Sequence, residues 1–331
     1  MAIAPDALRA HLQRCLGGPW PPPGDLKLRF TARRTHHEGY RIEHVSYLAE
    51  PDDRVPALLL IPEGVSAAHP APAILALHQH NGQWGLGKSE PAGLAGNPMH
   101  HTGAALAREG YVVLCPDALC FEDRASPHLP GARYEEFEAM RYLTRGTSLA
   151  WKNILDARRA VDLLTSLPEV DTDRLGAYGH SMGSTIAWLT GPFEPRLKAI
   201  VGNCCLPTYA AIQEHHLTHC HTTFVPGWQR QEDACEAVGI ADTPDLPDTP
   251  DIAGLIAPTP LHLNFGERDS GSPMSGVLPG IETIALAYEA AHAPGHFTAF
   301  VEPGAGHELT PAMWERTRAT FERYLRTQSG E

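Results

Sequence analysis

The spacing of apolar and polar residues changes along the chain and predicts two kinds of strand pairing. Residues 40–48 alternate apolar and polar positions, the pattern of an exposed antiparallel strand, and residues 55–61 form a more apolar strand that would pair with it. From residue 73 onward, short apolar runs alternate with segments of helical period. This alternation predicts an α/β fold with a mostly parallel, doubly wound sheet and helices on both faces.

The first part of the chain has a different pattern. Residues 7–16 space their apolar positions as an amphipathic helix does, and the proline- and glycine-rich residues that follow end this helix. We therefore predict an N-terminal helix and linker over residues 1–24 and one large α/β domain over residues 25–331. Among the later elements, the pattern predicts helices over residues 99–108 and 149–164 and strands over residues 198–202, 260–265 and 297–301.

One turn in this pattern carries the residues of a nucleophile. Residues 174–178 predict a buried strand and residues 184–190 a helix, with Gly179-His180-Ser181-Met182-Gly183 between them. Gly-x-Ser-x-Gly between a strand and a helix is the pattern of a nucleophile elbow, a turn so tight that larger side chains at the glycine positions would clash. The pattern predicts that the Ser181 hydroxyl stands above the sheet edge, at the N-terminus of the following helix.

A serine nucleophile needs a base and an acid, and both have candidates downstream. His307 follows the last predicted strand, at the end where active sites collect in open α/β sheets, whereas the alternative, His296, precedes that strand. Asp269 follows the preceding strand, and we prefer it to Glu267 because its shorter side chain is more rigid. The chain order Ser181, Asp269, His307 is that of α/β-hydrolases.

An acyl-transfer site also needs two hydrogen-bond donors for the oxyanion, and one is expected to be the backbone N–H of Met182. For the other, the turn His78-Gln79-His80-Asn81-Gly82 resembles the His-Gly-Tyr-Asn-Gly turn of acetyl xylan esterases and the His-Gly-x-Gly turns of the dienelactone hydrolase superfamily. The resemblance implies that the amide of His80 is the second donor, with Gln79 in place of the usual glycine. Alternatively, His78 and His80 are loop histidines that form only local hydrogen bonds.

The resemblance extends from residue 55 to the C-terminus. Residues 106–117 look like the helix, glycine cap, strand and Pro-Asp corner of these proteins, and residues 156–174 look like the helix and turn before their nucleophile. Residues 121–124 and 256–261 are similar to two further segments of the group. The resemblance implies an α/β-hydrolase fold and a serine esterase that needs no cofactor.

Residues from about 204 to 257 are the most individual part of the chain. They follow the sixth predicted strand, where such folds accept insertions, and we predict that they form a lid over the site. The pairs His215/His219 and His216/Cys220 are four residues apart and could share a helix face, which raises the alternative of a zinc site. We favour a histidine-rich lid helix without a metal, because nothing here resembles a metallohydrolase motif. The cluster comprises His215, His216, His219, Cys220 and His221.

Substrate contacts are predicted around the nucleophile at Gln79, Trp84 and Trp228. Trp84 and Lys88 belong to the loop after the oxyanion turn, which either contacts the substrate or is a surface excursion. Trp228 belongs to the predicted lid, where it either packs the lid against the body or lines the acyl pocket.

Composition restricts the cellular location and the partners that we expect for this protein. The seven cysteines, two of them adjacent, argue against a disulfide framework, and the first residues lack the features of a secretory signal, so we expect a cytoplasmic protein. No apolar run reaches the ~20 residues of a membrane span. The net charge of −13 disfavours nucleic acid as a partner, because its phosphates require a basic face. A homo-oligomer is compatible with these features.

These features predict a serine carboxylic ester hydrolase that acts on a small or short-acyl ester through an acyl-enzyme intermediate. A prolyl-oligopeptidase-like peptidase is the alternative among enzymes, but its propeller would need ~40 residues per blade, and too few residues precede residue 73. A non-catalytic binding protein of the same fold is a further alternative, which we expect to have lost one of the three candidate residues. All three are present.

Overall fold

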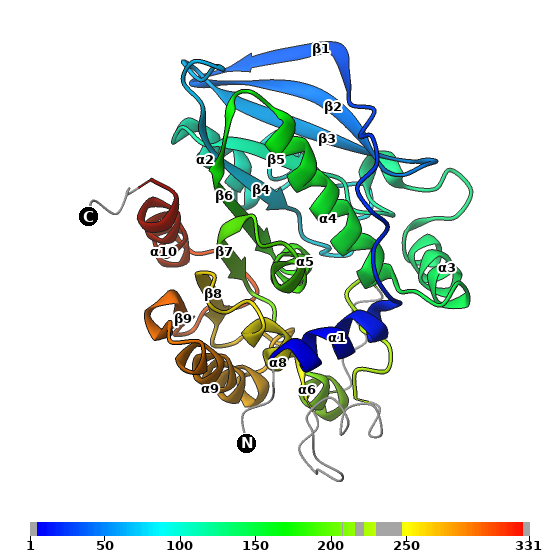
Figure 1. The fold of residues 1–331 in the computed structure, drawn as a ribbon, viewed down its shortest axis with the longest axis vertical. Coiled ribbons are helices and arrows are strands. Elements are labelled where there is room, and N and C mark those ends of the chain that lie inside the picture. Colours follow the sequence, from blue (N-terminus) through cyan, green and yellow to red (C-terminus); the bar gives the residue numbers. More distant parts are fainter. Residues whose placement is uncertain (1–4, 207, 216–221, 230–246, 327–331) are drawn as a thin grey trace.

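The computed structural model describes residues 5–206, 208–215, 222–229 and 247–326. Its framework is a nine-stranded sheet with the strand order β1-β2-β3-β5-β4-β6-β7-β8-β9 (Figure 1). Every residue of the central strand β4 is buried, as is typical of a strand covered on both faces. The strands are β1 (Arg29–His37), β2 (Tyr40–Glu50), β3 (Asp53–Pro62), β4 (Ala71–Leu77), β5 (Val112–Pro116), β6 (Val170–His180), β7 (Leu197–Asn203), β8 (Leu261–Gly266) and β9 (Phe297–Glu302).

The sheet is antiparallel at one end and parallel over the rest. β1, β2, β3 and β5 pair with antiparallel neighbours, and the five pairs from β5 through β9 are parallel, so the predicted mostly parallel sheet is confirmed. The apolar pattern does not predict β1, because none of its residues is buried. Its arginines and histidines suit an exposed edge strand. With β1 counted, the insertion expected after the sixth strand follows the seventh, β7.

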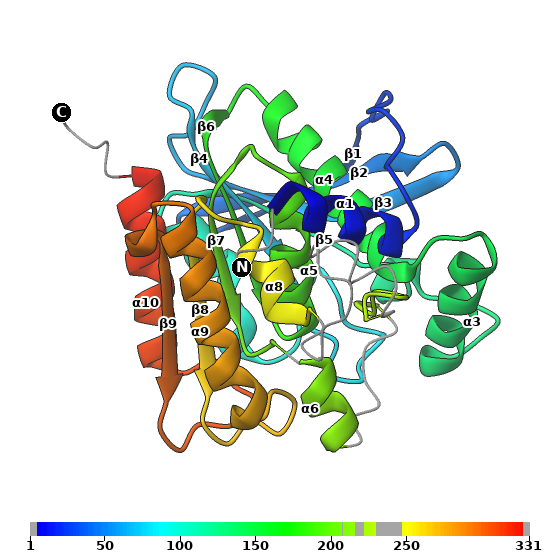
Figure 2. The same cartoon turned by 60° about the horizontal axis from the view of Figure 1, so that its bottom comes forward.

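Helices cover both faces of the sheet (Figures 1 and 2). Alternate residues of β5 point to opposite faces. Val112 and Leu114 belong to a large apolar cluster with α1, α4, α5, α8 and α9, whereas Val113 and Cys115 belong to a smaller cluster with α2 and α10. The prediction of a doubly wound sheet is therefore confirmed as well.

The longest helix is α4, where the sequence predicts a helix over residues 149–164. None of the helices in the described part of the chain is both long and apolar enough to cross a bilayer. The helices are α1 (Pro5–Leu16), α2 (Thr102–Arg108), α3 (Gly131–Thr144), α4 (Leu149–Ser166), α5 (Met182–Thr190), α6 (Tyr209–Glu214), α8 (Thr249–Gly254), α9 (Met274–Ala290) and α10 (Pro311–Phe321), with short helical turns η1 (Pro98–His100), η2 (Glu122–Arg124), η3 (Gly191–Phe193), η4 (Pro294–His296) and η5 (Glu322–Arg326).

The strand order creates a crevice at the carboxyl ends of β4 and β6. The chain continues from β4 to β5 on one side and from β6 to β7 on the other, so the loops after these neighbouring strands diverge. Open α/β sheets bind ligands at such a reversal. Residues 78–82 follow β4, Ser181 follows β6, Asp269 follows β8 and His307 follows β9, so the topology brings all four segments to one edge.

Candidate active site

Ser181 lies between β6 and α5 in a strained turn. Its φ of 55° and ψ of −121° are rare for a residue with a side chain, and such a conformation costs about 1–3 kcal/mol. The flanking glycines are required by sterics. A Cβ atom at Gly179 would lie 2.0 Å from the carbonyl carbon of Gly183, and one at Gly183 would lie 2.2 Å from the carbonyl oxygen of Leu77.

Ser181, His307 and Asp269 form a continuous chain of hydrogen bonds. Oγ of Ser181 lies 2.9 Å from Nε2 of His307, and Nδ1 of His307 lies 2.8 Å from Oδ2 of Asp269. Asp269 is 2% exposed. Its burial acts to raise the pKa, but hydrogen bonds from His307 and from the N–H of Gly271 outweigh that effect, so the pKa of Asp269 lies below its ordinary value. The carboxyl group is therefore ionised at neutral pH and can orient the imidazole.

Glu267 and His296, the alternative acid and the alternative base, form hydrogen bonds with other partners. Oε2 of Glu267 accepts a hydrogen bond of 2.8 Å from the N–H of Gly304. Nδ1 of His296 lies 2.7 Å from the carbonyl oxygen of Pro258, on an exposed turn before β9. The structure thus brings Asp269 and His307 to the serine, and it places Glu267 and His296 away from it.

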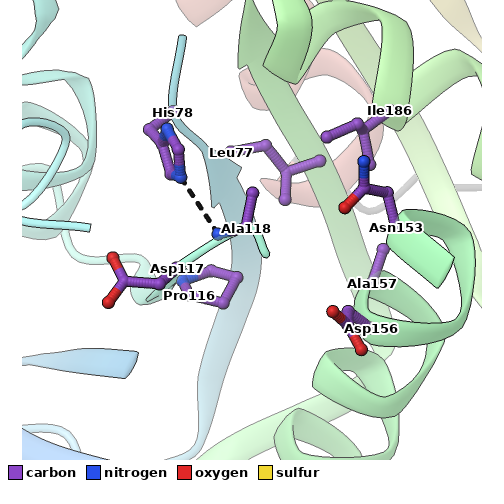
Figure 3. Close-up of a pocket in the computed structure, with 9 residues that line it drawn as sticks. All are labelled: Leu77, His78, Pro116, Asp117, Ala118, Asn153, Asp156, Ala157 and Ile186. Carbon is purple, nitrogen blue, oxygen red and sulfur yellow. Dashed lines mark hydrogen bonds between the residues drawn. The ribbon is translucent and has the colours of Figure 1, made fainter. Parts of the chain in front are cut away.

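His78 anchors the turn after β4. Its Nδ1 donates to the carbonyl oxygen of Gln79 at 2.8 Å. Its Nε2 accepts a hydrogen bond of 3.0 Å from the N–H of Ala118, which Figure 3 shows as a dashed line. Burial lowers the pKa of this imidazole to about 4, so it is neutral. The adjoining cavity, between His78 and Asn153, has a volume of about 20 Å³, which suits a water molecule and excludes an ester.

The two amides expected to bind an oxyanion flank the serine from different elements. The N–H of Met182 lies at the first position of α5, and the N–H of His80 lies in the turn after β4. Neither amide donates a hydrogen bond to another described residue. Both residues line the cavity that contains the Ser181 hydroxyl. Their role as oxyanion donors stays a prediction.

The cavity beside Ser181 has a volume of about 860 Å³, which is large enough for a small organic ester. Trp84 lines it, as expected, but Gln79 and Trp228 do not. The side chain of Gln79 is buried and donates to Oε2 of Glu90 at 2.9 Å. The described residues that line the cavity are His80, Asn81, Gly82, Trp84, Ala132, Glu135, Glu136, Ser181, Met182, Cys205, Asp269, Ser270, Gly271 and His307.

Trp228 packs as the first of its two sequence alternatives predicts, whereas Lys88 neither lines the cavity nor lies on the surface. Trp228 is 1% exposed and stacks on His11 of α1, with ring centroids 5.0 Å apart, so it packs its segment against the body of the protein. Lys88 is buried, and its Nζ lies 2.8 Å from Asp117 and 2.6 Å from Glu122. These carboxylates hold the ammonium away from the cavity.

Glu135 of α3 is a site residue that the sequence pattern does not reveal. Its side chain is 3% exposed. Its Oε2 lies 2.7 Å from Nε2 of His80 and accepts a hydrogen bond of 2.8 Å from Nε1 of Trp84. The carboxylate therefore connects α3 to the turn that carries the proposed oxyanion donor. No sequence motif links these residues, which are 51 and 55 positions apart.

Two buried imidazoles lie behind the candidate base. The ring centroids of His180 and His307 are 5.1 Å apart, and those of His100 and His180 are 4.4 Å apart. Burial lowers the pKa of His180 well below its ordinary value and also lowers that of His100. His307 therefore packs against a neutral, partly apolar layer.

Two groups of potential metal ligands occur in the described part of the chain. One consists of Cys204, Asp269 and His307. Of these, Asp269 and His307 already belong to the chain of hydrogen bonds that ends at Ser181. The other is an acidic group at Asp117, whose centre Lys88 occupies with its ammonium. Of the histidine cluster, only His215 lies among the described residues, where its Nε2 lies 3.4 Å from Oγ of Ser275. His216, His219, Cys220 and His221 lie outside them.

Comparison with known proteins assigns the chain to a protein family. Residues 55–219 match the model of the dienelactone hydrolase family. The chain is also 30% identical over 279 residues to "Putative hydrolase YtaP" of Bacillus subtilis (strain 168), with 82% of this chain and 84% of that protein covered. The chain belongs to the dienelactone hydrolase family. This membership confirms the predicted α/β-hydrolase fold and an enzyme of the carboxylic ester hydrolase kind.

Solved structures of other proteins share this fold. A glucuronoyl esterase from Solibacter usitatus matches with a TM-score of 0.67 and 17% identity, and the match covers 96% of this chain and 91% of that one. Acetyl xylan esterase 1 from Thermoanaerobacterium sp. JW/SL YS485 matches with a TM-score of 0.61 and 16% identity, covering 98% and 95%. At these identities the similarity is evidence for the shared fold.

Proposed function

We propose that this member of the dienelactone hydrolase family is a serine esterase, with Ser181 as nucleophile, His307 as general base and acid, and Asp269 as the residue that orients His307. The observation that carries the proposal is the unbroken chain of hydrogen bonds from Oγ of Ser181 to Oδ2 of Asp269, at 2.9 and 2.8 Å. A serine hydroxyl becomes a competent nucleophile when a positioned imidazole accepts its proton.

The reaction would run in two steps. Nε2 of His307 takes the proton of Ser181 as Oγ attacks the ester carbonyl, and the amides of Met182 and His80 donate hydrogen bonds to the oxyanion. The imidazolium then protonates the departing alcohol, which leaves an acyl group on Ser181. Water attacks this acyl group as His307 takes its proton, and His307 then returns this proton to Oγ of Ser181 as the carboxylic acid departs. Asp269 remains ionised throughout and stabilises the imidazolium.

The nucleophile is tested by Ser181→Ala. We expect hydrolysis of an aryl acetate to fall by about three orders of magnitude or more, with thermal unfolding unchanged, because the hydroxyl carries the covalent step. A fluorophosphonate should add its mass to the peptide that contains Ser181 in the wild type and not in the variant. Undiminished hydrolysis by the purified variant, or an adduct on another serine, would move the nucleophile elsewhere.

We further propose that the substrate has a short acyl group. Each buried methylene contributes only ~0.8 kcal/mol, and a pocket must be long enough to collect it, whereas the described lining offers a long acyl chain only the apolar side chains of Trp84, Ala132, Met182 and Cys205. Acetyl to butyryl esters should therefore be hydrolysed faster than esters of ten or more carbons. A chain-length series with and without a chelator measures this preference. Best turnover on long chains, or a loss on chelation that zinc restores, would contradict the proposal.

A further inference from the structure

The cavity beside Ser181 has two ends, one on each side of the serine. β6, which carries Ser181, lies between β4 and β7 in the strand order, with β8 and β9 beyond β7. In Figures 1 and 2, α3 and the strands β8 and β9 lie on opposite sides of α5, the helix that follows the serine. We call the two ends of the cavity the α3 end (Trp84, Ala132, Glu135 and Glu136) and the β9 end (Asp269, Ser270, Gly271 and His307).

Trp84 forms a rigid aromatic wall at the α3 end. Its Nε1 donates a hydrogen bond of 2.8 Å to Oε2 of Glu135. The ring makes a T-shaped contact with His80, with centroids 5.2 Å apart. The six-membered ring also packs against Gly131, where a Cβ atom would lie 2.7 Å from Cε3 of the indole. These contacts fix the indole, so a group bound at this end meets a wall that does not move aside.

The proposed mechanism directs the two parts of an ester to different ends of the cavity. Nε2 of His307 protonates the departing alcohol, so the alcohol oxygen must lie within hydrogen-bond reach of that nitrogen. The carbonyl oxygen must point to the amides of Met182 and His80. Because the three substituents of a planar carbonyl carbon point in different directions, the acyl chain extends away from both of these groups. The described lining on that side of the serine is the α3 end.

We propose that the acyl group of the substrate lies at the α3 end, where Trp84 limits its length, and that the alcohol lies at the β9 end. The proposal rests on the proposed esterase function and assigns the orientation of the ester in that same site. Ala132 follows Gly131, against which the indole packs, and it lines the cavity beside the acyl position. Ser270 lines the alcohol position. The two ends therefore select the acyl group and the alcohol independently.

Removing the wall should lengthen the acyl group that the enzyme accepts. We expect Trp84→Ala to raise kcat/KM for nitrophenyl octanoate relative to nitrophenyl acetate by about tenfold or more, because a pocket discriminates by about that factor for each methylene group that it excludes. Trp84→Phe is the matched control, because it keeps an aromatic ring and removes only the N–H that binds Glu135. It should keep the octanoate-to-acetate ratio within about threefold of the wild type. Thermal unfolding checks the folding of both variants.

A leucine at each end tests the orientation. Ala132 and Ser270 are exposed lining residues, so the larger side chain requires no repacking of the core. Ala132→Leu should lower kcat/KM for phenyl butyrate relative to phenyl acetate by about tenfold and leave the ratio of benzyl acetate to methyl acetate as in the wild type. Ser270→Leu should lower the benzyl-to-methyl ratio and leave the butyrate-to-acetate ratio unchanged. Ratios are compared because Ser270 adjoins Asp269, and a general loss of activity cancels in them.

The outcomes separate this proposal from the one on which it rests. If Ala132→Leu changes the alcohol series, or Ser270→Leu the acyl series, or if neither variant changes a ratio, the proposed orientation is wrong and the esterase function stands. An octanoate-to-acetate ratio that Trp84→Ala leaves unchanged, or that Trp84→Phe raises equally, would overturn the role of Trp84 as the wall. If Trp84→Ala does not fold, the two leucine substitutions still decide the orientation. No hydrolysis of any of these esters by the wild type would overturn both proposals.

Discussion

Asp269→Asn is the most informative perturbation of the proposed mechanism. The substitution keeps the size of the side chain and removes the negative charge that faces Nδ1 of His307 across 2.8 Å. With charge centres about 4 Å apart and an effective dielectric constant of about 20, the carboxylate stabilises the imidazolium by about 4 kcal/mol. Since each 1.36 kcal/mol corresponds to a factor of ten in rate, kcat for aryl acetate hydrolysis should fall about a thousandfold.

Glu267→Gln is the matched control for this experiment. It makes the same chemical change two residues away, on a side chain that accepts its hydrogen bond from Gly304 and does not contact His307. It should keep kcat within about threefold of the wild type. Rates of both variants should be measured across pH, with thermal unfolding as the check on folding. The reasoning is refuted if Asp269→Asn retains activity within tenfold, or if Glu267→Gln loses as much.

Two further predictions concern the turn after β4. Glu135→Gln should lower kcat for a neutral short-acyl ester about tenfold with a smaller change in KM, because neutral acceptors bind His80 and Trp84 more weakly and the turn loses its fixed position. A change confined to KM would show that Glu135 acts on substrate binding instead. The pKa of His78 is about 4 in the folded protein and about 6.5 when unfolded, so the unfolded chain binds the extra proton between these values. The free energy of unfolding should therefore decrease as pH falls from 6.5 to 4, by up to about 3 kcal/mol from this residue, and urea unfolding of His78→Asn should show a correspondingly shallower pH dependence.

The sequence alone predicts much of the framework and the three candidate catalytic residues. Strand and helix periods are local properties, so β2, β3, β4 and α4 can be recognised from a few consecutive residues. The elbow is also local, because Gly179 and Gly183 must be glycines wherever a strand turns this sharply into a helix. Asp269 and His307 are separated from Ser181 by many residues, but the topology of parallel strands brings all their carboxyl ends to one edge.

Tertiary structure decided the features that depend on contacts between distant segments. Glu135 joins the site because α3 packs beside the turn after β4, and nothing in its own sequence window indicates this contact. The sequence predicts that Gln79 and Trp228 line the pocket, but the side chain of Gln79 donates a hydrogen bond to Glu90 and that of Trp228 stacks on His11. β1 pairs with β2 although it has no buried residue to form an apolar pattern. The physical reason is the same in each case. A side chain's partners are set by the packing of whole elements, whereas the local sequence sets only which element it belongs to.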